Sequence, residues 1–327
     1  MLISRTPYRF SLYGGGLDYP GWYKKNNSRV LCAGLDYYCY QSVRELPPFF
    51  DHNYRICYSN IELAKNLDDI NHPSAREVIR KFGEGKSLEV NYVGDLPARS
   101  GIGSSSAFTV GLISSLCALN GKFLGRSLLA NSAIDLEQGP MQENVGFQDQ
   151  CASAFGGLII IEANGSKVSP RRFITTKEYE NYISSSLLMG FDGIERNSQI
   201  FSSKINNNVS MEKNVDLMQS LADLSNAGID AFSNEADINT HALITKRCRD
   251  LKLKLNGEDD NIRQNEIIQK TEMAGSLCTR LMGAGGGGFF VCWAPKECHE
   301  NIKNSVDIST WVDVRFSDTG SHIIFNT

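Results

Sequence analysis

The sequence predicts a two-domain α+β protein, and three observations lead to this prediction. Its 327 residues are enough for two domains that each have a substantial core. The first half alternates strand-like runs with helical segments, whereas the second half has a series of helices followed by strand, helix and strand. This order suits a two-layer α+β architecture. The composition loosens around residues 168–174, so we expect one domain over 1–172 and another over 173–327.

The elements of the first half follow from hydrophobic periodicity and turn residues. Strands are expected at 2–13, as a pair within 29–43, within 51–66, at 88–93 and at 158–161. Helices are expected over 68–82 with a break at His72-Pro73, after residue 103, over 126–138 and from 148 to 155.

The second half is expected to begin with a strand at 184–191. Helices then follow at about 197–205, 210–234, 236–255 and 265–277. The last elements are a strand at 288–294, a helix at 295–305, and strands at 312–315 and 320–325.

Composition excludes several classes of protein. A net charge of −4, with no basic run, argues against a nucleic-acid binder. No apolar run approaches the length of a membrane span, and Arg5 and Arg9 interrupt any secretory signal. Nine scattered cysteines without a C-x-x-C pair are typical of buried thiols in a reducing compartment, and with five histidines they form no metal-ligand pattern. We therefore expect a cytoplasmic protein.

The most informative stretch is residues 96–107, LPARSGIGSSSA. Gly101 and Gly103 allow close backbone approach to an anion, and Ser104 to Ser106 start an apolar helix. A glycine turn that leads into a helix N-terminus favours phosphate binding, and Pro97 fixes the approach to the turn. The alternative is a capped turn with no ligand.

Known nucleotide motifs do not fit the chain. It contains no G-x-x-x-x-G-K-[ST], which excludes a P-loop of the usual kind. Residues 283–288 satisfy G-x-G-x-x-G but lead into a strand rather than a helix, so a dinucleotide site is not predicted.

Several charged residues have both a functional and a purely structural interpretation. Arg9 and Asp18 flank a glycine corner and fit either a substrate wall or a surface salt bridge. Glu137, in the last turn of a helix, either faces solvent or binds Mg²⁺. Asp149 is, on local evidence, an acid at the start of a helix.

Three separated motifs, at residues 6–19, 97–107 and 281–288, resemble those of the GHMP kinases in order and spacing. The resemblance runs from about residue 2 to residue 290. It implies a ribosomal protein S5 domain 2-like N-terminal domain and a ferredoxin-like C-terminal domain. Two departures are Arg99, at a position that is usually small, and Arg280, where relatives often have lysine.

The resemblance also implies roles for individual residues, with ATP and Mg²⁺ as the cofactors. Asp149 would act as the base, and Arg9 would activate the hydroxyl and stabilise the transferring phosphate. Ser105 and Glu137 would bind Mg²⁺. The implied ATP-binding residues are Pro97, Ser100, Gly101, Ile102, Gly103, Ser104, Ser105 and Ser106, and the implied substrate-binding residues are Gly15, Gly16, Asp18, Arg196 and Gly286.

Within the superfamily the sequence is most similar to kinases of the anomeric hydroxyl of D-glycero-D-manno-heptose 7-phosphate. Arg196 would then bind the sugar phosphate, and Lys24, Lys25 and Arg29 are weaker candidates because exposed charges are usually solvated. The alternatives are a kinase of free fucose or galactose, a sugar sensor without catalysis, and a decarboxylase relative. The expected partner is a small sugar or sugar phosphate, with no nucleic acid or membrane, for a monomer or homodimer.

Overall fold

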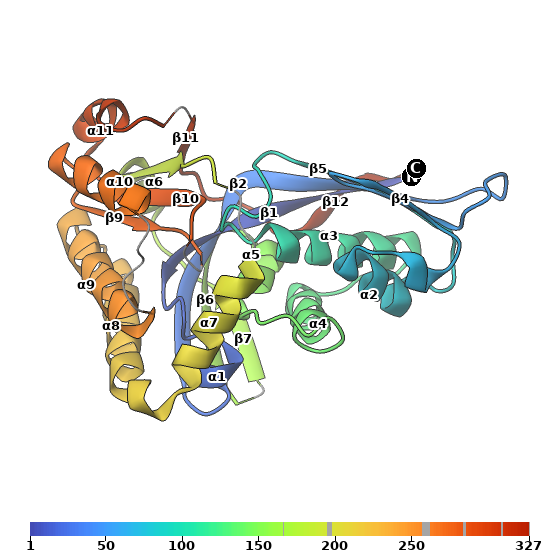
Figure 1. Ribbon diagram of the computed structural model, residues 1–327, viewed down its shortest axis with the longest axis horizontal. Helices are drawn as coiled ribbons and strands as arrows, with labels where there is room; N and C mark the ends of the chain where they lie inside the picture. Colours follow the sequence, from blue (N-terminus) through green and yellow to red (C-terminus); the bar gives the residue numbers. More distant parts are fainter. Residues whose placement is uncertain (166, 195–197, 257–261, 284–285, 309, 327) are drawn as a thin grey trace.

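The computed structural model describes residues 1–165, 167–194, 198–256, 262–283, 286–308 and 310–326. Within these ranges the chain forms an eight-stranded sheet and a four-stranded sheet. Helices α2, α3 and α4 lie on one face of the large sheet, and helices α8, α9 and α10 lie around the second part of the molecule (Figure 1).

The large sheet is organised around one long strand. Its order is β12-β1-β2-β5-β3-β4, with β6 paired to β2 and β7 paired to β6. Strand β2 pairs with β6 through residues 28–33 and with β5 through residues 39–45, so it belongs to two parts of the sheet. The strands are β1 (Leu2–Tyr13), β2 (Ser28–Glu45), β3 (Tyr54–Cys57), β4 (Ile61–Ala64), β5 (Leu88–Gly94), β6 (Leu158–Asn164), β7 (Lys167–Arg172) and β12 (His322–Asn326).

Helix α3 is the core helix of this part because it is apolar on nearly every side. It packs on β1 and β2 and against α2, α4 and α5, and most of its side chains are buried, including Phe108, Val110 and Leu112. The helical elements of the first part are α1 (Pro20–Tyr23), η1 (Leu67–Asp69), α2 (Pro73–Phe82), α3 (Ser104–Leu119), α4 (Arg126–Gln138) and α5 (Gln148–Phe155).

The second sheet is antiparallel, in the order β11-β8-β10-β9. Its strands are β8 (Leu187–Phe191), β9 (Cys278–Leu281), β10 (Phe289–Trp293) and β11 (Thr310–Asp313). The helical elements here are α6 (Lys177–Ser185), α7 (Ser198–Ser210), η2 (Glu212–Asn214), α8 (Val215–Ser233), α9 (Ile238–Asn256), α10 (Ile262–Met273), η3 (Lys296–Cys298) and α11 (His299–Ser305).

The α+β prediction is confirmed, and β1 and α4 have the predicted bounds. The prediction of a strand pair within 29–43 was wrong, because this segment is a single strand of 18 residues. Its apolar and aromatic residues favour extended structure throughout, and besides β1 it pairs with β5 and with β6 along different parts of its length. Strands β7 and β9 and helix α6 were not predicted.

The last strand crosses between the two predicted segments. Although β12 lies within 173–327, it pairs with β1 in the large sheet, from Leu2 opposite Asn326 to Arg5 opposite His322. The two chain ends consequently lie side by side (Figure 1). The domain boundary at residues 172 and 173 stays a prediction.

Candidate active site

The serine loop, residues 96–106, leads directly into α3. Gly103 is the residue before the helix and has φ +74°, which L-residues disfavour. A Cβ on Gly103 would lie 2.9 Å from the Cγ of Asp149, so the close approach of this carboxylate also requires glycine. The first backbone N–H groups of α3, which belong to Ser104, Ser105 and Ser106, have no partners within the helix. This geometry is suited to binding an anion.

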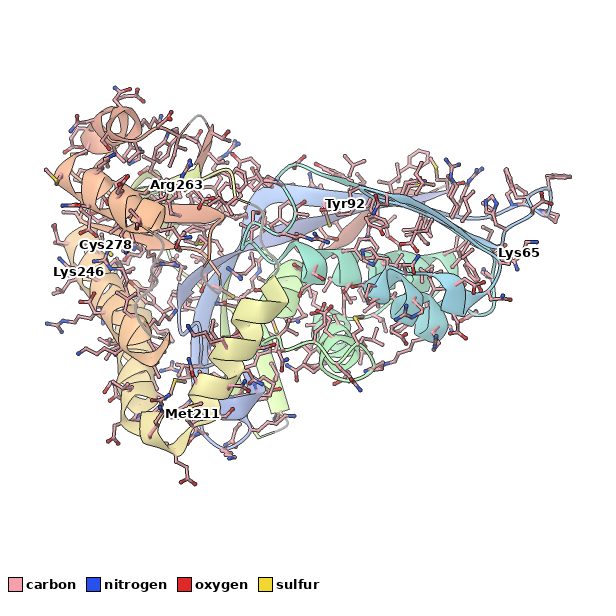
Figure 2. All side chains as sticks on the ribbon, in the orientation of Figure 1. Lys65, Tyr92, Met211, Lys246, Arg263 and Cys278 are labelled. Carbon is pink, nitrogen blue, oxygen red and sulfur yellow. The ribbon has the colours of Figure 1, made fainter. Side chains whose placement is uncertain are left out.

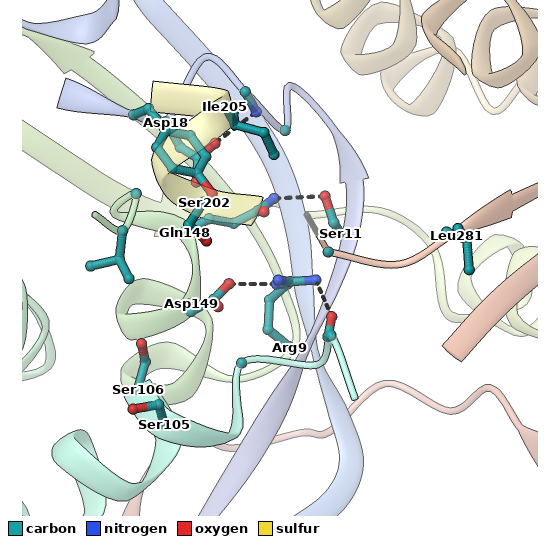
Figure 3. A pocket seen from close by; sticks show the side chains of 18 of the residues that line it. Arg9, Ser11, Asp18, Ser105, Ser106, Gln148, Asp149, Ser202, Ile205 and Leu281 are labelled. Carbon is teal, nitrogen blue, oxygen red and sulfur yellow. Dashed lines mark hydrogen bonds and ion pairs between the residues drawn. The ribbon is translucent and has the colours of Figure 1, made fainter. Parts of the chain in front are cut away.

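Arg9 and Asp149 meet beside this loop. Strand β1 supplies Arg9 and the first turn of α5 supplies Asp149, and their Nε and Oδ1 atoms are 2.5 Å apart (Figure 3). Arg9 also donates from Nη1 to the carbonyl of Gly101 at 3.2 Å. Its side chain is 7% exposed and that of Asp149 is 28% exposed. A carboxylate is therefore held at a fixed position and remains accessible.

The glycine-rich segment after β9 holds the serine loop from the other side. The backbone N–H of Phe289 donates to the carbonyl of Ser100 at 3.0 Å. A Cβ on Gly288 would lie 2.3 Å from that carbonyl oxygen, so no larger residue can approach the loop in this way. Ser100 in turn donates to the carbonyl of Pro97 at 2.6 Å. Pro97 and Ser100 therefore shape the loop and are not among the residues that line the cavity.

Asp18 is buried beside the first glycine turn. Its Oδ1 accepts a hydrogen bond from the backbone N–H of Gly16 at 2.8 Å (Figure 3). Burial raises the pKa of Asp18, a hydrogen bond from Gly16 opposes the rise, and the charge of Asp149 adds to it. Asp18, Gly15 and Gly16 line the same cavity as Arg9 and Asp149. The structure thus brings the predicted base and the predicted sugar ligands together.

Glu137 lies behind the serine loop and is fully buried. Its Oε2 accepts hydrogen bonds from Ser106 Oγ at 2.8 Å and from Gln150 Nε2 at 2.5 Å. Among the described residues, its Oε1 has no hydrogen-bond partner. Burial raises the pKa of Glu137 to about 8, and the charge of Glu143 adds to the rise.

The predicted pair of Ser105 and Glu137 is not brought together. Ser105 is exposed at the cavity, and Ser106 is the serine that contacts Glu137. Successive residues of a helix point in directions about 100° apart, so only one of two adjacent serines can face this carboxylate.

The cavity itself has a volume of about 1130 Å³ and lies between the two parts of the molecule. One end is aromatic: His72 stacks on Phe108 with ring centroids 4.5 Å apart, and Tyr58 meets His72 edge-on at 4.9 Å. Burial lowers the pKa of His72, which favours the neutral ring. This end is suited to a flat, uncharged ring system.

Comparison with known proteins identifies the first part of the chain. Residues 71–157 match the family model described as the GHMP kinases N-terminal domain. This segment is therefore similar to the N-terminal domain of GHMP kinases. The resemblance inferred from the sequence is therefore confirmed. The chain is also 25% identical over 299 residues to the D-glycero-alpha-D-manno-heptose 7-phosphate kinase of Campylobacter jejuni, covering 88% of this chain and 87% of that protein.

Solved structures extend the GHMP kinase fold to the whole chain. A D-glycero-D-manno-heptose 1-phosphate kinase from Bacteriodes thetaiotaomicron aligns with a TM-score of 0.79 at 19% identity, covering 100% of both chains. Lactococcus lactis galactokinase, solved with galactose, aligns with a TM-score of 0.75 at 16% identity, covering 98% of this chain and 94% of that one. The predicted GHMP kinase fold is confirmed.

Other predicted residues of this GHMP kinase fold lie elsewhere. Gly101, Gly103, Ser104 and Ser106 line the cavity, whereas Ile102 is buried and Gly286 is not among the described lining residues. Arg196 lies outside the described residues. The aromatic end of the cavity was not predicted from the sequence, although Tyr58 and Phe108 lie on either side of the predicted His72-Pro73 helix break.

Two features are absent from the described ranges. No helix there is both long enough and apolar enough to cross a membrane. No group of three or more His, Cys, Asp or Glu side chains in that part of the chain is placed to hold a metal ion.

Proposed function

We propose that this protein is an ATP-dependent sugar kinase. The observation that supports this most strongly is the Arg9–Asp149 ion pair, which lies beside the glycine and serine residues at the start of α3. Phosphoryl transfer needs the phosphates held, their charge neutralised and the acceptor hydroxyl aligned. The named relatives are kinases of heptose phosphates and galactose, in agreement with this chemistry.

ATP would bind with its phosphates at the serine loop. The backbone N–H groups of Ser104, Ser105 and Ser106 begin α3, where the positive end of the helix dipole favours phosphate. The adenine ring would bind at the aromatic end of the same cavity, against the side chains of His72 and Tyr58. With about 1130 Å³, the cavity has room for a nucleotide and a sugar together.

Asp149 would accept the proton of the acceptor hydroxyl as its oxygen attacks the γ-phosphorus. A new O–P bond forms, the bond from the γ-phosphorus to the β–γ bridging oxygen breaks, and ADP leaves with the electron pair. Arg9 contacts Asp149 and the carbonyl of Gly101, so it lies where it can neutralise the charge that develops during transfer.

The residues around Glu137 fit a divalent cation. The carboxyl group has a buried Oε1 without a partner among the described residues, and hydroxyl groups of the serine loop are nearby. Carboxylate and hydroxyl oxygens are ligands that Mg²⁺ accepts, and bound Mg²⁺ would offset the charge of the transferring phosphate. Glu137 would hold the ion with Ser105 or Ser106.

The substrate we propose is the anomeric hydroxyl of D-glycero-D-manno-heptose 7-phosphate, giving the 1,7-bisphosphate used for nucleotide-activated heptose and surface glycans. Similarity to the Campylobacter jejuni kinase over most of the chain supports it. A free sugar is the alternative, which the likeness to galactokinase favours. All nine cysteines are free thiols, as expected for a cytoplasmic enzyme.

The test is ADP release from Mg-ATP with heptose 7-phosphate, free heptose, fucose and galactose. Replacing the base in Asp149→Asn is expected to lower kcat about 10²- to 10⁴-fold. Asp135→Asn, an exposed carboxylate on α4, is the matched control and should behave like the wild type. Turnover by Asp149→Asn at the wild-type rate would show that Asp149 is not the base. Sugar binding without ADP release by the wild type would support a sensor instead.

A further inference from the structure

Two cationic side chains from the second part of the molecule meet at the first glycine turn. Lys252 lies on α9 and Arg280 on β9, and both line the cavity. Arg280 donates from Nη2 to the carbonyl of Ser11. A Cβ on Gly15 would lie 3.1 Å from Lys252 Nζ and 3.4 Å from Ser11 Oγ. Both cations therefore lie close to the same short segment of the chain.

Neither cation has a carboxylate in ion-pair contact among the described residues. Two other arginines at the cavity are paired: Arg249 contacts Glu272 at 2.5 Å, and Arg9 contacts Asp149 at 2.5 Å. Arg280 instead donates to the backbone carbonyl groups of Leu281 and Ser11 and to the sulfur of Met282.

Like charges that are desolvated together destabilise a protein unless an anion joins them. Burial lowers the pKa of Lys252, and the positive charge of Arg280 lowers it further. Burial also lowers the pKa of Arg280. Asp18 acts on Lys252 through space but forms no ion pair with it in the described structure. A bound anion would offset this cost.

The position of the two cations separates them from the serine loop. In Figure 3, the Arg9–Asp149 pair lies between Ser105 and Ser106 on one side and Ser11 on the other. The phosphates of ATP are proposed to lie at the serine residues. An anion at Ser11 would therefore belong to the acceptor, on the far side of the reacting groups.

We infer that Lys252 and Arg280 form a second anion site, which binds a phosphate group already present on the acceptor sugar. Two cations match the charge of a phosphate monoester, and a guanidinium matches its oxygen geometry. This inference rests on the proposed kinase function and narrows its substrate to a sugar phosphate. It also assigns the phosphate contact to residues other than Arg196.

The experiment compares Lys252→Gln, Lys252→Arg and Lys246→Gln with the wild type. Lys246 is exposed on the outer side of the same helix, so its variant is the matched control (Figure 2). KM is measured for heptose 7-phosphate, for unphosphorylated heptose and for ATP. Because hydrogen bonds to charged groups are strong, we expect Lys252→Gln to raise KM for heptose 7-phosphate about 10- to 100-fold. The KM values for free heptose and ATP should stay near those of the wild type, and Lys252→Arg should retain most of the affinity.

Other results would overturn the inference without touching the kinase proposal. A wild type that uses free heptose as efficiently as heptose 7-phosphate has no phosphate site. A higher KM for ATP in Lys252→Gln would assign the cations to the nucleotide. Should the wild type release no ADP with any of the sugars, the kinase proposal fails, and calorimetry of sugar binding without ATP then decides the inference. The inference is supported if the wild type binds heptose 7-phosphate more tightly than free heptose and Lys252→Gln loses this preference. It is refuted if the wild type shows no such preference.

Discussion

Glu137 carries a buried carboxyl group for which no Lys or Arg among the described residues forms an ion pair. Its pKa of about 8 lies above that of an unfolded chain, about 4.3. Between these values the folded protein keeps a proton that the unfolded chain releases, so stability falls as pH rises, by up to about 1.4 kcal/mol per pH unit. The Glu137→Gln variant lacks this titration.

We therefore expect the wild type to lose stability relative to Glu137→Gln as the pH rises from 5.5 to 7.5. Urea unfolding without divalent cations at three pH values measures the difference. Parallel pH profiles for the two proteins would show that Glu137 is ionised in the folded state throughout.

The adjacent residues Ser105 and Ser106, of which only Ser106 contacts this carboxyl group, lead to a second prediction at the residue scale. Ser106 donates to Glu137 and is buried, so Ser106→Ala should cost about 1–3 kcal/mol of stability. Ser105 is exposed, and Ser105→Ala should change stability by less than about 0.5 kcal/mol. Chemical denaturation checks both values. A titration of Mg²⁺ against activity then shows which hydroxyl helps to bind the ion, because only that variant should need more Mg²⁺.

At the scale of elements, the start of α3 depends on Gly103. Gly103→Ala should lower stability by about 1–3 kcal/mol, because φ is +74° and the new Cβ would displace Asp149. Since small displacements of catalytic groups are costly, kcat should fall by about tenfold or more.

Gly121→Ala is the control for this variant. Gly121 has φ +66° after the end of α3, and nothing lies within 4 Å of its added Cβ. Gly121→Ala should lose stability because its backbone conformation disfavours alanine, but it should keep the wild-type kcat. Equal kcat values for both variants would mean that Asp149 tolerates the displacement.

Elements with strong local signals were predictable from the sequence. The apolar run after Gly103 and the glycine turns around it gave α3, and β1 ended where its glycines begin. Contacts between distant segments were not predictable. The orientation of Ser106 toward Glu137 depends on how α3 packs on α4, and Lys252 and Arg280 meet only because α9 and β9 pack together.

At the scale of the whole molecule, β12 covers an edge that β1 would otherwise expose. Removing residues 322–327 deletes the ladder from Leu2–Asn326 to Arg5–His322 and should cost about 2–4 kcal/mol, at roughly 0.5–1.5 kcal/mol per hydrogen bond. It should also promote association through the free edge of β1. Thermal unfolding and light scattering test both effects. Ile324→Thr, at a side chain 47% exposed, keeps the backbone pairing and should change little. An unchanged melting temperature after truncation would mean that β12 contributes nothing to the sheet.

The return of β12 to the first sheet also has a consequence for synthesis on the ribosome. β1 can pair with β2 soon after both have been synthesised, yet it acquires its second partner, β12, only after residue 326 has been added. The edge of β1 in the nascent first sheet therefore stays unpaired while some three hundred further residues are synthesised. A protein with this topology folds correctly only if its last strand is synthesised and paired before the unpaired edge of β1 pairs with another chain.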